Sequence, residues 1–308
     1  MGAVRGFDAA LETFFGKSKE RKMATFYNQA TLSFGGNVVN SNTTEAELLS
    51  GLSITKTAVT PTYTAGGNVV YAITISNMST TVYNALTVTD DLGAYTIPGG
   101  TADVVPLTYV DGSIIYYLNG AVQADPTVVG TPNLTVSGIN LPANSTATLI
   151  YEVNANEFAP ISAGSTITNT ATVDGGAGVG ELTATATVTV VEEPTLTIAK
   201  AVCPAVITDN GTLTYTIIVQ NLGNTPILAT DNVVISDTFN PALSNITVTL
   251  GGTPLVENTG YTYNATTGEF ATTNGTVTVP AATYTQDTTT GAITTTPGVA
   301  VLTVTGTV

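Results

Sequence analysis

Leu52-Ser-Ile-Thr-Lys56 returns later in the chain as Leu196-Thr-Ile-Ala-Lys200, and this repeat decides the fold. Two further blocks return at the same offset, namely Gly67-Asn-Val-Val-Tyr71 as Gly211-Thr-Leu-Thr-Tyr215 and Ile73-Thr-Ile-Ser-Asn77 as Ile217-Ile-Val-Gln-Asn221. After a short insertion, Leu86-Thr-Val-Thr-Asp90 is matched by Val233-Val-Ile-Ser-Asp237. The chain therefore contains one structural unit used twice.

Within these blocks apolar residues alternate with polar ones, and Gly, Asn, Pro or Asp stands at their ends. An alternation of period two is typical of half-buried antiparallel strands. A unit built from several such strands predicts an all-β chain of two tandem Ig-like antiparallel β-sandwich domains. We expect the first domain at residues 51–192 and the second at residues 193–308.

Residues 52–90 and 196–237 resemble the "conserved repeat domain" family of bacterial and archaeal surface proteins, a family of unknown function. Its hallmarks are a Leu-x-Ile-x-Lys opening, a Gly-x-x-x-Tyr-x-Ile-x-x-x-Asn strand pair, a strand that ends in Asp, and an Asn-x-Ala-x-Val closing strand. The first repeat has all four, and the second lacks the closing motif. The resemblance implies an Ig-like surface or stalk module with no established activity.

The composition supports strands and excludes several classes of function. Roughly one residue in five is Thr and 30 are Gly, while only 9% carry charge, which favours β-strands joined by tight turns. The net charge of −15 would repel nucleic acids and anionic membranes. With no His and one Cys, the chain cannot form a His-based triad, a His-ligated metal site or an intrachain disulfide. We therefore expect no enzyme, no cofactor, no metal site and no nucleic-acid partner.

Residues 1–22 differ from the rest, because five of the seven basic residues lie before Met23. This segment predicts either a short amphipathic basic leader or a mis-assigned start, with Met23 as the true first residue. Neither start shows the apolar core of a secretory signal, and no apolar run reaches the roughly 20 residues of a membrane span. We expect an extracellular location or a cell or spore surface, with an export route that the sequence does not reveal.

The two repeats differ at their ends. The first closes with strands at 147–153, 167–173 and 182–190, whereas the second stops at 300–306, the counterpart of 147–153. The missing closing motif stands at the other end of the protein, where Phe26-Tyr-Asn28-Gln-Ala30-Thr-Leu32 parallels residues 167–173. We therefore predict that residues 23–50 are donor strands. Their interface residues would share one strand face, and they are Phe26, Asn28, Ala30 and Leu32.

Two arrangements would complete the second domain. Insertion into the next copy is β-strand addition between chains, a head-to-tail contact that propagates into a homopolymer, the structural subunit of a fibre or appendage. Two donated strands of about ten residues would bury on the order of 2,000 Å², in the range of obligate interfaces. In the alternative, the strands fold back onto their own chain, and the protein is a monomeric cell-surface adhesin or glycan-binding module whose glycan or host ligand is unknown.

Strand parity also places polar residues on inward faces. In the first repeat these are Lys56, Asp90 and Asn169. In the second they are Lys200 and Asp237, with Asn28 as the displaced third member.

Such a triad predicts one of two arrangements. Because burial lowers the pKa of a lysine and raises that of a carboxyl group, a neutral amine can face a carboxamide polarised by a protonated acid, which is the arrangement for a Lys–Asn isopeptide bond. Similar cross-links occur in Ig-like domains of Gram-positive pilins and adhesins, which these repeats resemble in their first-strand Lys and last-strand Asn. The competing interpretation is a buried Lys–Asp ion pair that sets strand register, with the Asn hydrogen-bonded nearby. Asn77 and Asn221 also point inward by parity, so the choice of Asn stays open.

Overall fold

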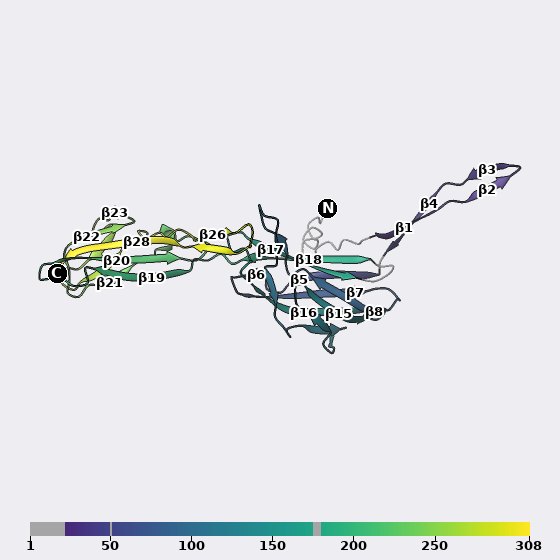
Figure 1. Ribbon diagram of the computed structural model, residues 1–308, viewed down its shortest axis with the longest axis horizontal. Helices are drawn as coiled ribbons and strands as arrows, with labels where there is room; N and C mark the ends of the chain where they lie inside the picture. Colours follow the sequence, from purple (N-terminus) through teal and green to yellow (C-terminus); the bar gives the residue numbers. More distant parts are fainter. Residues whose placement is uncertain (1–21, 50, 175–179) are drawn as a thin grey trace, which may run out of the picture. The chain divides into compact units, whose positions relative to one another are not determined.

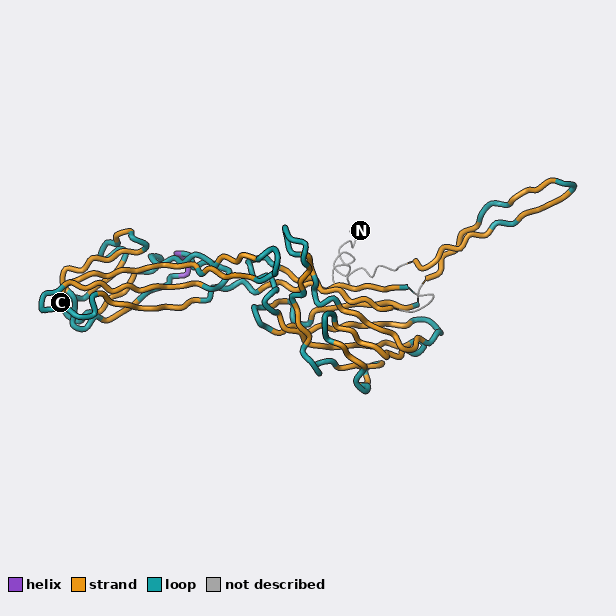
Figure 2. Tube along the Cα trace, viewed as in Figure 1, coloured by secondary structure: helices purple, strands orange, loops and turns teal. Residues whose placement is uncertain are grey.

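The computed structural model describes residues 22–49, 51–174 and 180–308. Within these ranges the chain consists of strands and loops, with one short 3₁₀ helix at Ala229–Asp231 (Figure 2). The predicted all-β, Ig-like fold is confirmed. The interpretation of residues 1–22 concerns a segment that lies, apart from Lys22, outside the described residues.

Backbone contacts divide the chain into two compact units. The first runs to Thr96 and includes Asp103–Ala159 and Thr166–Thr189, and the second comprises Ile97–Ala102, Pro160–Ser165 and Val190–Val308. We call strands β5 to β18 domain 1, strands β19 to β28 domain 2, and residues Lys22 to Leu49 the N-terminal ribbon.

Domain 1 is a sandwich of two six-stranded sheets (Figure 1). In spatial order, the first sheet consists of β13 (Ala121–Val122), β12 (Ile115–Leu118), β16 (Ser145–Ala155), β7 (Asn68–Asn77) and β5 (Leu52–Ala58), with β11 (Leu107–Tyr109) also paired to β16. The second consists of β14 (Thr127–Val129), β15 (Leu134–Leu141), β8 (Tyr83–Asp90), β17 (Thr166–Asp174), β18 (Glu181–Val190) and β6 (Thr62–Tyr63). The short strands β9 (Tyr95–Thr96) and β10 (Asp103–Val104) form a separate pair.

The period-two alternation builds the core of domain 1. Along β7 and β16 nearly every second residue is buried, and the register places Tyr151 opposite Tyr71. Strand β8 lies between β15 and β17, so Asp90 has Leu134 on one side and Ala171 on the other. The inward faces of β5, β8 and β17 therefore meet in one buried interior.

Domain 2 repeats the first sheet but has a reduced second sheet. The first consists of β19 (Leu196–Cys203), β20 (Thr212–Asn221), β28 (Gly298–Thr307), β22 (Ser244–Leu250) and β23 (Thr253–Pro254). The second consists of β21 (Ser236–Thr238), β25 (Glu269–Thr272) and β24 (Tyr261–Tyr263), and β26 (Thr283–Gln286) pairs with β27 (Ile293–Thr296).

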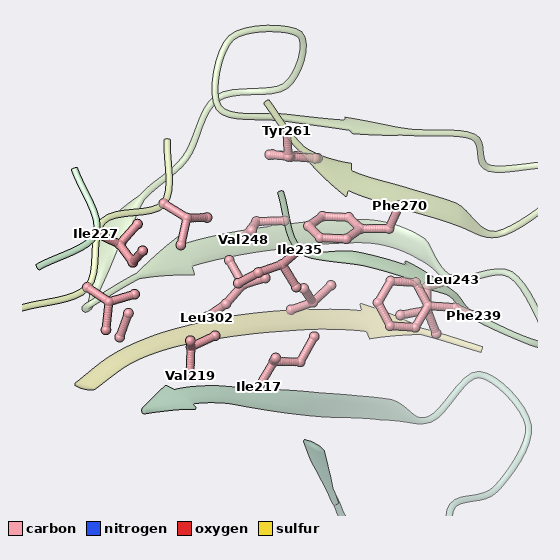
Figure 3. Close-up of a cluster of buried hydrophobic side chains, with 14 of the residues drawn as sticks. Ile217, Val219, Ile227, Ile235, Phe239, Leu243, Val248, Tyr261, Phe270 and Leu302 are labelled. Carbon is pink, nitrogen blue, oxygen red and sulfur yellow. The ribbon is translucent and has the colours of Figure 1, made fainter. Parts of the chain in front are cut away.

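The core of domain 2 lies between these two sheets (Figure 3). Ile217 and Leu302 project from the larger sheet, and Phe270 covers them from the smaller one. Phe239 packs with its ring centre 5.9 Å from that of Phe270. Strands β20, β28, β22 and β25 contribute residues to this cluster, whereas β19 contributes none and lies at the edge of the sheet.

The N-terminal ribbon is a long hairpin. Strand β1 (Lys22–Asn28) pairs with β4 (Thr44–Leu49), and β2 (Thr31–Phe34) pairs with β3 (Asn37–Asn40). The turn uses Gly35 and Gly36 with φ of 54° and 83°, values that the two-residue hairpin turn requires.

The expected single strand face over residues 26–32 is wrong in one respect, because β1 ends at Asn28 and β2 begins at Thr31. The interruption coincides with hydrogen bonds across the hairpin: the Ala30 N–H donates to Ser41 Oγ at 2.9 Å, and the Gln29 side chain donates to the Ser41 carbonyl at 2.8 Å. These side-chain bonds interrupt the regular ladder, although the Ala30 carbonyl still accepts the Ser41 N–H at 2.8 Å.

Candidate functional site

Lys56 lies in β5 and points into domain 1, as parity predicts, with only 6% of the residue exposed. Its Nζ lies 2.5 Å from Asp90 Oδ2 and 4.8 Å from the centre of the Tyr71 ring. Because Lys56 belongs to one sheet and Asp90 ends a strand of the other, this ion pair joins the two sheets across the core.

Asp90 is fully buried and is held by three donors. Its Oδ2 also accepts a hydrogen bond from the Tyr151 hydroxyl, and its Oδ1 accepts one from the Leu92 N–H at 3.0 Å. The rings of Tyr151 and Tyr71 stack with centres 5.9 Å apart. A buried carboxylate is tolerated when it is paired and hydrogen-bonded in this way.

Asn169 on β17 is fully buried, again as parity predicts. It lies two residues before Ala171, which stands opposite Asp90, so both polar side chains face the same interior. The carboxamide of Asn169 lies near the hydroxyls of Tyr71 and Tyr151 and lowers the pKa of each, against the larger effect of burial. Neither its Nδ2 nor its Oδ1, however, makes a hydrogen bond of normal geometry. A buried polar group left without a partner costs about 1–3 kcal/mol, and the Tyr71 hydroxyl of the same cluster also has no hydrogen-bond partner.

Asn77 and Asn221 show what a satisfied buried asparagine looks like in this fold. Asn77 Nδ2 donates to the carbonyls of Thr81 at 2.7 Å and Pro142 at 2.8 Å, and its Oδ1 accepts the Ser79 N–H at 3.0 Å. Asn221 makes the matching set in domain 2, through the Thr225 and Pro280 carbonyls and the Thr195 and Gly223 N–H groups. Both hold the loops around the strand ends, which leaves Asn169 as the inward Asn of the Lys–Asp cluster.

Burial in domain 1 shifts the pKa values of Lys56, Tyr71 and Tyr151. Burial lowers the pKa of Lys56 from its usual 10.5, against the opposing attraction of Asp90. Burial, followed by the charge of Asp90, raises the pKa values of Tyr71 and Tyr151 above their usual 10. Near neutral pH the two phenols therefore keep their protons, and the amine holds its proton less strongly than an exposed lysine does.

Domain 2 assembles only part of this cluster. Lys200 forms an ion pair with Asp237 and lies 4.4 Å from the Tyr215 ring centre, but its side chain is 38% exposed and that of Asp237 is 16% exposed. The expectation that Lys200 is buried like Lys56 is therefore wrong, because no strand equivalent to β17 covers β19 among the described residues. Val304 stands opposite Tyr215, where domain 1 has Tyr151, so the second phenol is also missing.

The exposure of Lys200 extends along the whole of β19. Every residue of this strand is exposed, whereas its counterpart β5 buries Leu52 and Lys56. Strand β21, the counterpart of β8, pairs with β25 alone among the described strands, although β8 has partners on both sides. Domain 2 thus presents an uncovered face and an unpaired strand edge at the position that β17 fills in domain 1.

The predicted donor residues lie on the N-terminal ribbon. Asn28, Ala30 and Leu32 are exposed, and the side chain of Phe26 lies outside the description. Parity identified the Lys, Asp and Asn positions but missed Tyr71 and Tyr151. The Gly-x-x-x-Tyr motif and the inward position of Tyr151 in residues 147–153 were the available signals for these two phenols.

The described residues contain no group of three His, Cys, Asp or Glu side chains that could hold a metal ion. In the same part of the chain, no helix is long and apolar enough to cross a membrane.

Comparisons with known proteins give fold likenesses without a family assignment. No family model matches the chain, and no curated protein sequence matches it. Among solved structures, BcpA, the major pilin subunit of Bacillus cereus, is 13% identical over 89% of this chain and 81% of its own, with a TM-score of 0.35. The collagen-binding domain from a Staphylococcus aureus adhesin is 11% identical over 43% of this chain and 95% of its own, with a TM-score of 0.28.

A third similar structure is AvmM, which catalyses macrocyclization in alchivemycin A biosynthesis, at 12% identity over 54% of this chain and 97% of its own, with a TM-score of 0.28. Identities and TM-scores this low carry no inference about function. The resemblance to the conserved repeat family likewise stays a prediction from the sequence motifs.

Proposed function

We propose that this chain is the structural subunit of a surface fibre, and that the N-terminal ribbon of one copy inserts into domain 2 of the next. The observation that carries the proposal is a pair of complementary defects. Among the described residues, domain 2 has no strand in the place that β17 takes in domain 1, and the ribbon carries the sequence motif of that strand with Asn28, Ala30 and Leu32 exposed.

The acceptor side is an apolar strip on β19. Leu196, Ile198 and Val202 lie on the same face as Lys200, with exposures of 40%, 65% and 40%. Soluble domains normally cover such a strip, and an unpaired strand edge beside it is a template for strand addition. The unpaired edge of β21 gives an incoming strand a ladder on which to form backbone hydrogen bonds.

The donor side matches in sequence and in form. The motif Asn28-x-Ala30-x-Leu32 corresponds to Asn169-x-Ala171-x-Val173 on β17. The ribbon is an antiparallel hairpin, as is the pair β17 and β18 that closes domain 1. A lone two-stranded hairpin is marginally stable in water, so burial against another sheet favours the ribbon as well as the acceptor.

We favour a second copy as the occupant because only two residues join the ribbon to β5 of domain 1, while domain 2 begins after the whole of domain 1 in the chain. A contact of this type is heterologous, so each subunit that joins offers a new acceptor and the assembly extends. A subunit of such a fibre would act outside the cell or on a cell or spore surface. The alternative is a monomeric adhesin or glycan-binding module in which the ribbon closes its own domain 2.

Two full-length variants test this proposal by mixing. Leu32→Asp places a charge on the predicted inward face of the donor, and Ile198→Asp places one on the acceptor strip. Each variant alone should lose polymerisation in size-exclusion chromatography and negative-stain images, while the two together should form a dimer through the one intact donor and the one intact acceptor. A monomer closed on itself predicts no such dimer.

Matched controls use the neighbouring residues that point to the opposite faces. Ser33→Asp and Ala199→Asp should polymerise like the unchanged chain, because both positions are exposed and lie off the proposed interface. A chain shortened to residues 51–308 should remain a short, aggregation-prone monomer. If the unchanged chain is a monomer at all concentrations and the shortened one is merely less stable, the fibre proposal fails and the folded-back module replaces it.

A further inference from the structure

The buried cluster of domain 1 holds two groups whose burial is unfavourable for different reasons. Lys56 is an amine whose side chain is fully removed from solvent, and Asn169 is a fully buried carboxamide without a normal hydrogen bond. Asp90 and Tyr71 contact Lys56, and Asn169 lies near enough to the hydroxyls of Tyr71 and Tyr151 to lower their pKa values in part. Strands β5 and β17 also approach to within 8 Å between Cα atoms, so both side chains reach one interior.

We propose that Lys56 and Asn169 join by an amide bond inside domain 1, formed by the chain itself after folding. Such a bond turns the unsatisfied carboxamide into part of a cross-link and removes a charge from the core. It also connects the first strand of the domain to its closing strand.

The step balances without any added reagent. The Lys56 ammonium gives a proton to the Asp90 carboxylate, and the neutral Nζ then attacks Asn169 Cγ. The Nζ–Cγ bond forms, the Cγ–Nδ2 bond breaks, and Nδ2 leaves as ammonia with the second proton of Nζ, relayed by Asp90. Asp90 keeps the first proton and ends the step as a neutral acid, and the released molecule is neutral ammonia, so the buried carboxyl group is not left charged without its lysine partner. The Tyr151 hydroxyl, which donates to Asp90, positions this carboxyl group throughout.

The ion-pair interpretation accounts for Lys56 and Asp90 but leaves Asn169 unexplained. In the same fold, Asn77 is also almost fully buried, and its donors and acceptor are all used. A plain structural role for Asn169 would predict similar partners. The lowered pKa of Lys56 agrees with the geometry, because a larger neutral fraction of the amine is available for attack.

Two measurements on the denatured, full-length chain test the proposal directly. The intact mass should lie below the calculated mass by one ammonia, about 17 Da, for the single cross-link formed by this attack. Trypsin offers an independent check, because Lys56 and Lys200 are the only basic residues after Lys22. A chain with a free Lys56 is cut after both lysines, whereas the cross-linked chain is cut after Lys200 and retains residues 23–200 in one piece.

Variants locate the bond and identify the role of Asp90. Asn169→Ala and Asp90→Ala should each show the full calculated mass and cleavage after Lys56, and fragmentation of the linked peptide should place the bond at Asn169 and not at Asn77. Lys200→Arg is the matched control and should keep the loss of ammonia. The unchanged chain decides the matter even if a variant fails to fold: a full calculated mass together with cleavage after Lys56 overturns the proposal, whatever the state of polymerisation.

Discussion

Domain 1 and domain 2 begin with nearly the same strands and end differently. Leu52 on β5 is 3% exposed, while the matching Leu196 on β19 is 40% exposed. The side chain of Lys56 is 0% exposed and that of Lys200 is 38% exposed, although each faces an aspartate. One closing strand therefore separates a sealed core in domain 1 from an uncovered sheet face in domain 2. The same residues form a desolvated cluster in one domain and a solvent-accessible ion pair in the other.

The largest expected difference concerns the two aspartates. In the Asn169→Ala background, where Lys56 stays a free amine, adding Asp90→Ala leaves that lysine buried without its partner, which costs about 3–5 kcal/mol in the free energy of unfolding relative to Asn169→Ala. Asp237→Ala breaks a partly exposed ion pair in domain 2, and the expected cost is about 0–1 kcal/mol. Urea unfolding of these full-length variants measures both values. Equal costs would show that Lys200 is as desolvated as Lys56, and the contrast between the domains would be lost.

The leucines at the start of each domain provide a second matched pair. Leu52→Ala removes a buried side chain and should destabilise domain 1 by about 2–5 kcal/mol. Leu196→Ala should cost well under about 1 kcal/mol in the monomer, because a largely exposed side chain buries little apolar surface. In the assembled fibre the second substitution should become costly, since the donated strands cover that position. A Leu196→Ala effect that is identical in monomer and fibre would argue against coverage of β19.

Much of this contrast can be predicted from the sequence. Period-two alternation placed Lys56, Asp90 and Asn169 in the core of domain 1, because inward and outward positions on a strand follow from parity alone. The fold class followed from the repeated blocks. Exposure of Lys200 did not follow, since parity gives the face of a strand and not whether another sheet covers it.

Other features depend on contacts that no local pattern encodes. The break between Asn28 and Thr31 coincides with hydrogen bonds to Ser41, which is distant in the chain. The different roles of Asn169 and Asn77 depend on which carbonyl and N–H groups lie within hydrogen-bond reach of each side-chain amide. Tyr151 could be placed inward by parity, but its bond to Asp90 depends on how the two sheets pack.

Domain 2 has Val304 at the position of Tyr151, and this difference predicts a difference in the rate of bond formation between the two domains. If the ribbon brings Asn28 beside Lys200 and Asp237, a second Lys–Asn bond can form between subunits. We expect it to form more slowly than the bond at Lys56, because Val304 replaces the Tyr151 hydroxyl that positions the carboxyl group. A time course compares two rates: the appearance of multimers that resist SDS, which reports the bond between subunits, and the loss of ammonia from the mass of the monomer, which reports the bond at Lys56. Asn28→Ala should remove these multimers, while SDS-dissociable fibres at all times would show that domain 2 forms only an ion pair.

The smallest expected effect is a pH dependence that appears only when the Lys56 amine is free. In Asn169→Ala, Lys56 remains titratable and faces Asp90, Asp91, Tyr71 and Tyr151. Because its folded pKa lies below the unfolded value of 10.5, the folded state binds fewer protons within that interval, and the free energy of unfolding rises with pH. Above about pH 10 the two tyrosines act in the opposite direction, since folding raises their pKa values and stability falls as the unfolded phenols ionise.

Urea unfolding between about pH 7 and 9.5 measures the contribution of Lys56 to the pH dependence of the free energy of unfolding, because the tyrosines contribute at higher pH. Asn169→Ala should gain stability across this range relative to Asn169→Ala combined with Lys56→Met, in which the amine is absent and the tyrosines remain. The unchanged chain should behave like the double variant, because an amide nitrogen does not titrate in water. A rise in the unchanged chain as steep as that in Asn169→Ala would mean that Lys56 is a free amine in both, and domain 1 would then differ from domain 2 in burial alone.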